Sequence, residues 1–197
     1  MVASRSTAWR AGFAHRPRQA ERDRAVRLPQ GVWRSLLGDL ETVARYHRSV
    51  YRRGPGDHWF WLGPISQDGQ AKLRTSKAAG SRTIAAPVLG WHLSRGGLRR
   101  MPDGRLPVIR HACDESACMN PVHWVLGTRA DNMADYRDRK SDPLGPLADK
   151  RGPAGRARAI RDAILAARAH GPEAAEQAIR RAGDQGMPGV QDALTLG

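Results

Sequence analysis

Apolar positions recur at helical intervals near the start of the chain. Five of them are separated by three, four or seven residues, which places them on one helix face: Val32, Leu36, Leu40, Val43 and Val50. They predict one helix over residues 32–51, which ends before Gly54-Pro55-Gly56 because glycine and proline interrupt helices. The preceding residues, 1–30, carry many charges and few large apolar side chains, so we expect a basic, disordered arm there.

Extended patterns replace the helical one after residue 57. The stretch HWFWLGPISQDGQAKLRT predicts a strand, a turn at QDGQ and a second strand. TIAAPVLGWHLSRGG predicts a strand end and a short helix that closes at Gly96-Gly97, and RLPVIRH and VHWVLG predict two more strands. The tryptophans of this region are predicted to pack in the core: Trp59, Trp61, Trp91 and Trp124.

A helix with a defined start follows the last of these strands. Thr128 is the expected N-cap, and Asp131 the expected partner in a capping box, for a helix that runs to about Lys140. Residues 142–197 then form a Pro/Gly-rich linker and two Ala- and Arg-rich helices, at about 154–169 and 172–183. That pair could be a helix-turn-helix, a dimerisation hairpin or a solvated pair of helices, and the sequence favours the last. The fold class that these elements predict is α+β.

The charge balance points to a polyanionic partner. Lys and Arg total 33 against 19 Asp and Glu, a formal net charge of +14, and the basic residues are spread along the chain. Such an excess bears on partners rather than on fold, and it favours nucleic acid over an anionic membrane surface. No apolar run approaches the roughly 18 residues of a membrane span, so we expect no membrane association. A homodimer is left open.

Both cysteines of the chain lie in one short loop, HACDESACMNPVHW. Cys113, Cys118 and His123 form C-x4-C-x4-H, and thiolate and imidazole ligands suit tetrahedral zinc. Three ligands do not close a structural zinc site, so His58, which opens the aromatic strand, is the predicted fourth ligand. The alternative is that the cysteines are small buried side chains and His123 a core histidine. Two cysteines at this spacing make a poor disulfide framework, which favours a reducing, cytoplasmic location.

This loop resembles a known nuclease motif. The pattern H-x-C-x4-C-x-N-P-x-H, followed by Asp131-Asn132 on a helix, is similar to that of the HNH, or ββα-metal (His-Me finger), endonucleases. The similarity is greatest to the branch of His-Cys box homing endonucleases and phage HNH proteins, and it covers about residues 58–140. It implies a zinc-stapled ββα-metal nuclease domain over residues 31–141, with flanking helices, in a bacterial or phage-infected cell.

The resemblance also implies a metal-dependent endonuclease that hydrolyses phosphodiester bonds in DNA, with double-stranded DNA as its partner. His111 would be the general base, Asn132 the protein ligand of a single catalytic Mg2+, and the cysteine loop would hold structural zinc. The residue types suit these roles, because a neutral imidazole accepts a proton near pH 7 and a carboxamide oxygen is a ligand that Mg2+ accepts. The rival interpretation is a zinc-stabilised DNA-binding protein without catalysis, and a third is an RNA-binding protein.

One departure from the family pattern bears on DNA contacts. Many relatives carry a His-Arg pair in the helix before the motif, where this chain has Pro87-Val88. An arginine that contacts the scissile phosphate must then come from elsewhere. The predicted DNA-contact residues lie on the hairpin and its surroundings: Lys72, Arg74, Lys77, Arg82 and Arg110. The alternative for this surface is an ordinary solvated face.

Overall fold

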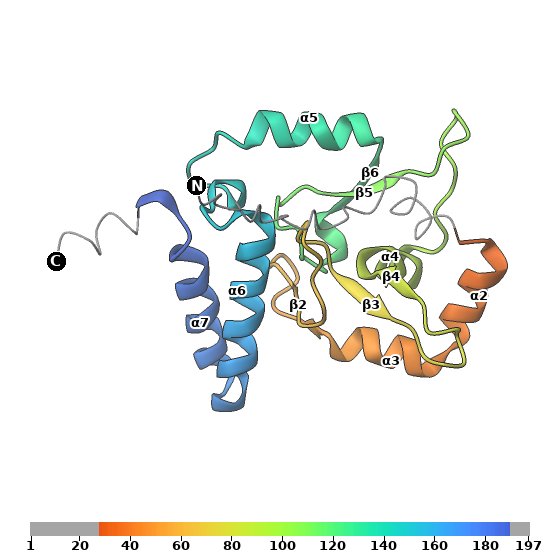
Figure 1. The fold of residues 1–197 in the computed structure, drawn as a ribbon, viewed down its shortest axis with the longest axis horizontal. Helices are drawn as coiled ribbons and strands as arrows, with labels where there is room; N and C mark the ends of the chain where they lie inside the picture. The colour runs from red at the N-terminus through yellow and green to blue at the C-terminus, as the bar shows by residue number, and fades with distance from the viewer. Residues whose placement is uncertain (1–27, 190–197) are drawn as a thin grey trace, which may run out of the picture.

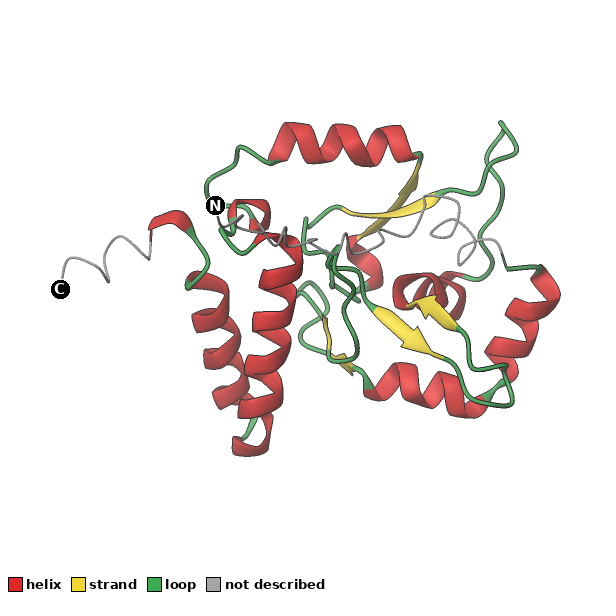
Figure 2. Cartoon of the chain, in the orientation of Figure 1, coloured by secondary structure: helices red, strands yellow, loops and turns green. Residues whose placement is uncertain are grey.

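Short helices alternate with three two-stranded antiparallel sheets in the computed structural model, which describes residues 28–189 (Figures 1 and 2). The predicted α+β class is confirmed. The predicted arm lies outside the described residues, apart from residues 28–30. No helix within residues 28–189 combines the length and apolar character needed to cross a membrane. The elements, in chain order, are α2 Gln30–Gly38, α3 Leu40–Arg48, β1 Val50–Tyr51, β2 Phe60–Trp61, β3 Lys72–Arg74, β4 Thr83–Ala85, α4 Ala86–Arg95, β5 Val108–His111, η1 Pro121–His123, β6 Trp124–Gly127, α5 Arg129–Arg139, η2 Pro146–Ala148, α6 Gly152–Ala167, η3 Arg168–His170 and α7 Pro172–Asp184.

The single helix predicted over residues 32–51 is wrong, because the chain breaks at Asp39 into α2 and α3. Asp39 has extended backbone angles, and its carboxylate accepts a hydrogen bond from Thr42 N at 3.1 Å. This N-cap starts a new helix in a new direction, an outcome that Asp and the preceding glycine favour. Leu40, counted on the apolar face of the predicted helix, is 82% exposed.

The predicted hairpin after residue 57 is only partly correct. β2 pairs with β1, Val50 opposite Trp61, while β3 pairs with β4. Only the turn at QDGQ forms as predicted, closed by a bridge between Ile65 and Ala71. Pairing around this turn extends to Pro64, whose carbonyl accepts from Lys72 N at 2.9 Å; Pro64 has no N–H of its own to donate.

The ββα order of β5, β6 and α5 follows the sequence prediction closely. β5 and β6 pair antiparallel with His111 opposite Trp124. The predicted capping box is present: Asp131 N donates to Thr128 Oγ1 at 3.0 Å, and Thr128 N donates to Asp131 Oδ2 at 2.7 Å. α5 then lies across this hairpin, at the top of Figure 1. None of the residues of α5, all of which the structure describes, is buried.

The main core joins the first helices to the ββα unit. Trp61 and Trp124 are almost fully buried in it, and Trp59 and Trp91 pack against it, as predicted. Gly90 of α4 permits a close approach here, because a Cβ at this position would overlap the Tyr46 hydroxyl and lie 2.6 Å from the Trp124 ring. Glycine at this position therefore lets α4 pack directly on the residues behind the cysteine loop.

The C-terminal helices pack on the rest of the protein and are not the solvated pair that the sequence favoured. α6 and α7 lie side by side (Figure 1), within two residues of their predicted bounds. Phe60 of β2 packs between apolar side chains of this pair: Ile160, Ile164, Ile179 and Ala182. Arg53 and Glu176 form an ion pair at 2.5 Å between the loop after β1 and α7.

Candidate metal centre

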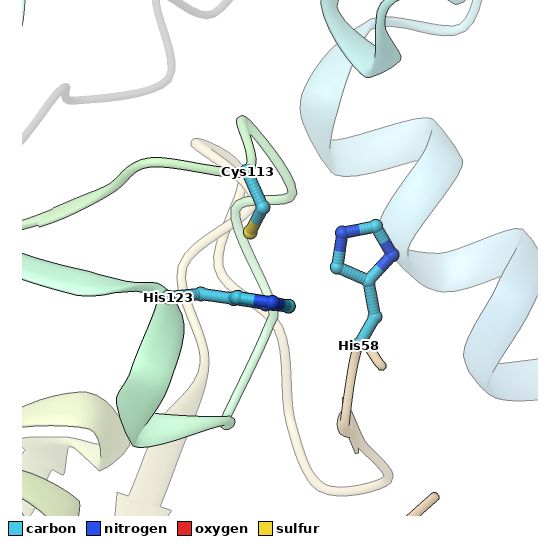
Figure 3. Close-up of side chains that lie close together, drawn as sticks. All are labelled: His58, Cys113 and His123. Carbon is cyan, nitrogen blue, oxygen red and sulfur yellow. The ribbon is translucent and has the colours of Figure 1, made fainter. Parts of the chain in front are cut away.

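Three side chains from distant parts of the chain meet at one point (Figure 3). His58 lies just before β2, Cys113 follows β5, and His123 is the last residue of η1. One ligand atom from each lies within 4.8 Å of the other two, and each side chain is partly exposed. This group could hold a metal ion, and it is the only such group of His, Cys, Asp or Glu side chains within residues 28–189.

Cys118, which is fully buried, lies at the edge of this group. Its Sγ is 3.4 Å from His123 Nδ1. With Zn–S near 2.3 Å and Zn–N near 2.0 Å, neighbouring ligand atoms of a tetrahedral site are separated by roughly 3.3–3.8 Å. The Cys118–His123 distance is therefore one that two ligands of the same ion would have. Three of the four predicted zinc ligands form the group that could hold a metal ion, and Cys118 lies beside it, in contact with His123.

The hydrogen bonds of His123 fix its tautomer. Its Nε2 lies 3.2 Å from the Gly56 carbonyl oxygen. A carbonyl only accepts, so Nε2 carries the proton and donates, which leaves a lone pair on Nδ1 facing Cys118. Metal-binding histidines are commonly fixed in this way by a carbonyl on the second nitrogen.

The two thiols are coupled to each other. Their shared hydrogen bond lowers the pKa of Cys118 and raises the pKa of Cys113; burial raises the pKa of Cys113 further, and a hydrogen bond with His58 opposes this. Cysteines bind metals as thiolates, so a bound cation would displace the thiol protons.

Asn120 joins the cysteine loop to the segment that carries His58. Its Nδ2 donates to Pro55 O at 2.8 Å and to Asp57 O at 2.7 Å, while its Oδ1 accepts from Val122 N at 3.2 Å. The side chain is 1% exposed, and all of its hydrogen-bonding capacity on Nδ2 is used inside the protein. One buried carboxamide therefore fixes the residues on either side of the metal-ligand group.

His111 is directed into the same loop. Its Nε2 lies 2.9 Å from the Cys118 carbonyl oxygen, which also accepts from Trp124 Nε1 at 3.2 Å. Nε2 must donate, so Nδ1 is left as an acceptor. Desolvation is the main cause that lowers the pKa of His111 to about 4; the carbonyl hydrogen bond opposes this shift, and the charges of His123 and His58 add to it. The ring is therefore neutral at pH 7.

Asn132 is placed differently. It lies exposed on α5, and contacts between α5 and β5 run through the neighbours of His111: Arg110 Nη1 donates to Asp135 at 2.5 Å, and Arg139 Nη1 donates to Ala112 O at 2.9 Å. No hydrogen bond joins Asn132 to His111 in the described part of the chain. Arg110, a predicted DNA contact, is held in this ion pair and its side chain is 18% exposed.

The other predicted DNA-contact residues lie on the β3–β4 hairpin. Arg74, Lys77 and Arg82 are exposed, and Lys72 is partly exposed. Thr75 holds the loop between the strands, because its N donates to Arg82 O and its Oγ1 accepts from Arg82 N, both at 2.8 Å. The hairpin is a supported basic surface with no described acidic partner for Arg74, Lys77 or Arg82.

A second basic surface was missed from the sequence. The loop between α4 and β5, residues 96–107, turns back on itself with Met101 N donating to Arg105 O at 2.8 Å. It carries Arg99, Arg100 and Arg105, all exposed, and a Cβ at Gly104 would meet nothing within 4 Å. The sequence RRMPDGR could have predicted this surface, because a Pro-Asp-Gly turn with arginines on both sides forms an exposed basic tip. We refer to residues 96–107 as the arginine loop.

Comparisons of this chain with protein-family models, with curated proteins and with solved structures found no match.

Proposed function

We propose that this protein is a metal-dependent endonuclease that hydrolyses phosphodiester bonds in DNA and is stapled by a structural zinc ion. The observation that carries the proposal is the position of His111. It ends the first strand of a ββα unit, and a carbonyl of the cysteine loop fixes its neutral tautomer with Nδ1 as the proton acceptor. A histidine that served only packing would not need this arrangement beside a metal-ligand group.

Zinc is the ion that the donor set fits best. His58, Cys113 and His123 have ligand atoms within 4.8 Å of one another, and Cys118 Sγ lies 3.4 Å from His123 Nδ1. Thiolates and imidazoles are soft and borderline ligands that select zinc over Mg2+ or Ca2+. Zinc bound there would link the segment around His58 to the loop around Cys113, two stretches about 55 residues apart in sequence. Its role would be structural, because four protein ligands leave no open coordination position for substrate.

His111 would act as the general base. Nδ1 accepts a proton from a water molecule that attacks the phosphorus atom, while Nε2 stays bound to the Cys118 carbonyl, which stabilises the imidazolium that forms. A pKa near 4 makes a weak base, and the phosphate of bound DNA would raise it by favouring the charged ring. General-base catalysis of this kind contributes about 10²–10⁴-fold.

Asn132 would supply a carboxamide oxygen to a catalytic Mg2+ from the exposed surface of α5. When bound, the ion would stabilise negative charge on the leaving 3′ oxygen. One protein oxygen is a weak binding site, so we expect DNA phosphate and water to complete the coordination.

Two basic surfaces would hold DNA. One is the β3–β4 hairpin with Arg74, Lys77 and Arg82, and the other is the arginine loop. Guanidinium and ammonium groups on protruding ribbons suit phosphate contacts, which give binding without sequence preference and a strong dependence on salt. The net charge of +14 supports the same class of partner.

The proposal is tested by metal analysis and cleavage together. Purified protein should contain one zinc per chain and should convert supercoiled plasmid to nicked or linear DNA in Mg2+ but not in EDTA. Asn132→Ala should require a higher Mg2+ concentration for half-maximal rate and keep its zinc. A folded, zinc-loaded protein that shifts DNA on a gel but never cuts it would instead favour the non-catalytic DNA-binding protein.

A further inference from the structure

Helix α6 covers the outer side of the cysteine loop. Glu115, which lies between the two cysteines, is 1% exposed, and its Oε2 accepts from Arg156 Nε at 2.8 Å. Arg156 belongs to α6, and its side chain is 14% exposed. A fully buried carboxylate is unfavourable without a partner, and Arg156 is the only residue of the described chain with a hydrogen bond to it.

The arginine is itself fixed by the C-terminal hairpin. Arg156 Nη1 donates to Gly183 O, at the end of α7, at 3.2 Å, and lies 3.5 Å from the Asp149 carboxylate. Asp149 has a fully buried side chain that also pairs with Arg151 at 2.6 Å, and Arg151 donates to Ala182 O at 2.7 Å. Glu115 is thus connected through Arg156 to the ends of both helices.

Uncharged contacts also hold the cysteine loop against the start of α6. Ser116 Oγ lies 3.1 Å from Gly69 O and 3.5 Å from Pro153 O at the start of α6. Gly69 has a positive φ, and a Cβ there would come within 2.8 Å of Ser116 Oγ and 3.0 Å of Ala154 N. The loop therefore lies between α6 and the turn at Gly69, with no room for a side chain at that position.

We propose that Arg156 is a positioning residue of the metal centre: through Glu115 it fixes the loop that presents Cys113 and Cys118, which makes the C-terminal hairpin part of the metal site. The turn that connects Glu115 to Cys118 is short, with Cys118 N donating to Glu115 O at 3.0 Å. A shift of Glu115 therefore moves Cys118. The proposal rests on the proposed binding of zinc by this loop.

The charge pair can be separated from simple helix packing with matched variants. Arg156→Met keeps a long apolar side chain but leaves Glu115 buried without a partner. Arg156→Lys keeps the charge and loses the planar donor group. Arg161→Met, in the same helix, is the control, because Arg161 pairs with the exposed side chain of Asp162.

Zinc affinity, measured by competition with a chromogenic chelator, should fall about 10–100-fold in Arg156→Met, the usual effect of losing a group that orients a metal ligand. Arg156→Lys should fall between this variant and wild type, and Arg161→Met should match wild type. The thiolate-to-metal charge-transfer band of the Co2+-loaded protein should shift or weaken in Arg156→Met alone. Wild-type affinity and an unchanged Co2+ spectrum in folded Arg156→Met would overturn the proposal.

Amide hydrogen exchange of residues 113–118 separates this proposal from the zinc assignment. Without metal, exchange in this loop should be faster in Arg156→Met than in wild type or Arg161→Met. If wild-type protein binds no zinc, the proposed function fails, while the exchange comparison still decides whether Arg156 holds the loop. If Arg156→Met does not fold, the same comparison with Arg156→Lys decides it, and unchanged exchange and affinity there would count against the proposal.

Discussion

Replacing Asn120 should separate hydrogen bonding from shape at the centre of the site. Asn120→Ala removes three hydrogen bonds at a side chain that is 1% exposed: two that it donates, to Pro55 O and Asp57 O, and one that it accepts from Val122 N. At about 0.5–1.5 kcal/mol net for each of the three hydrogen bonds, the free energy of unfolding should fall by about 1.5–4.5 kcal/mol.

Asn120→Asp has almost the same shape but should be at least as destabilising at pH 7–8. It keeps the oxygen that accepts from Val122 N, but it turns the donor group toward Pro55 and Asp57 into an anionic oxygen that faces two carbonyl oxygens. A buried carboxylate without a donor is strongly unfavourable. Asn132→Asp, at an exposed position, is the matched control and should change stability by less than about 0.5 kcal/mol.

The measurement is guanidinium denaturation at one fixed free zinc concentration, because bound zinc itself adds to the unfolding free energy. Zinc affinity should fall in the same order, since Asn120 holds the segment that ends at His58. If Asn120→Asp were as stable as wild type and bound zinc equally well, Asn120 would not be donating to the two carbonyls, and its role in fixing the His58 segment would be refuted.

Three further predictions test packing, pH dependence and DNA contacts. Gly90→Ala should destabilise the protein by about 1–3 kcal/mol because the new Cβ overlaps Tyr46 and Trp124. Gly97→Ala should not destabilise it, because a Cβ at Gly97 would have no other atom within 4 Å. Equal melting temperatures of the two variants would contradict this prediction. Burial raises the pKa of Asp149, but Arg151 and, to a smaller extent, Arg156 outweigh burial and keep this pKa below its usual value. The stabilisation by the Asp149 carboxylate is therefore present above about pH 4 and lost as pH falls below that. The stability difference between wild type and Asp149→Asn should shrink from pH 5 to pH 2, and a constant difference would exclude this contribution. Replacing Arg99, Arg100 and Arg105 by Ala should reduce the slope of the logarithm of the DNA-binding constant against the logarithm of salt concentration by up to about 2.7, at about 0.9 for each lost phosphate contact. The same charge change at Arg168, Arg180 and Arg181 should leave this slope unchanged. Equal effects of the two sets would show that the arginine loop does not contact DNA.

Local chemistry explains the elements that could be predicted from the sequence. Thr128 and Asp131 form a capping box within four residues, and Gly96 ends α4 with a positive φ, so both boundaries depend only on neighbouring residues. The alternating strands around His111 and Trp124 were predicted for the same reason. Neighbouring residues could not predict that His58 lies close to the loop of Cys113. That prediction rested on the need for a fourth zinc ligand and on the family resemblance.

The errors lie where distant pairings decide the structure. Strand β1 consists of two residues and pairs with β2 across the loop that contains Gly54, and so short a strand has no pattern of its own. The helix break at Asp39 was hidden because Leu36 and Leu40 keep a helical interval through it, although only Leu36 is buried.

The positions of charged residues were the hardest to predict from the sequence. Glu115 and Arg156 are residues of kinds that are usually exposed, and only the docking of α6 shows that they form a buried pair. The same holds for Arg110. It was predicted from the sequence to contact DNA, but in the structure it forms an ion pair with Asp135.

The most direct test of the central claim is the initial rate of supercoiled plasmid cleavage in Mg2+ by zinc-loaded His111→Ala, compared with wild type at equal DNA occupancy. If His111 Nδ1 accepts the proton of the attacking water, the rate should fall by about 10²–10⁴-fold while zinc content and DNA affinity stay close to wild type. A His111→Ala protein that cuts at the wild-type rate would contradict the assignment of the base and the proposed mechanism with it.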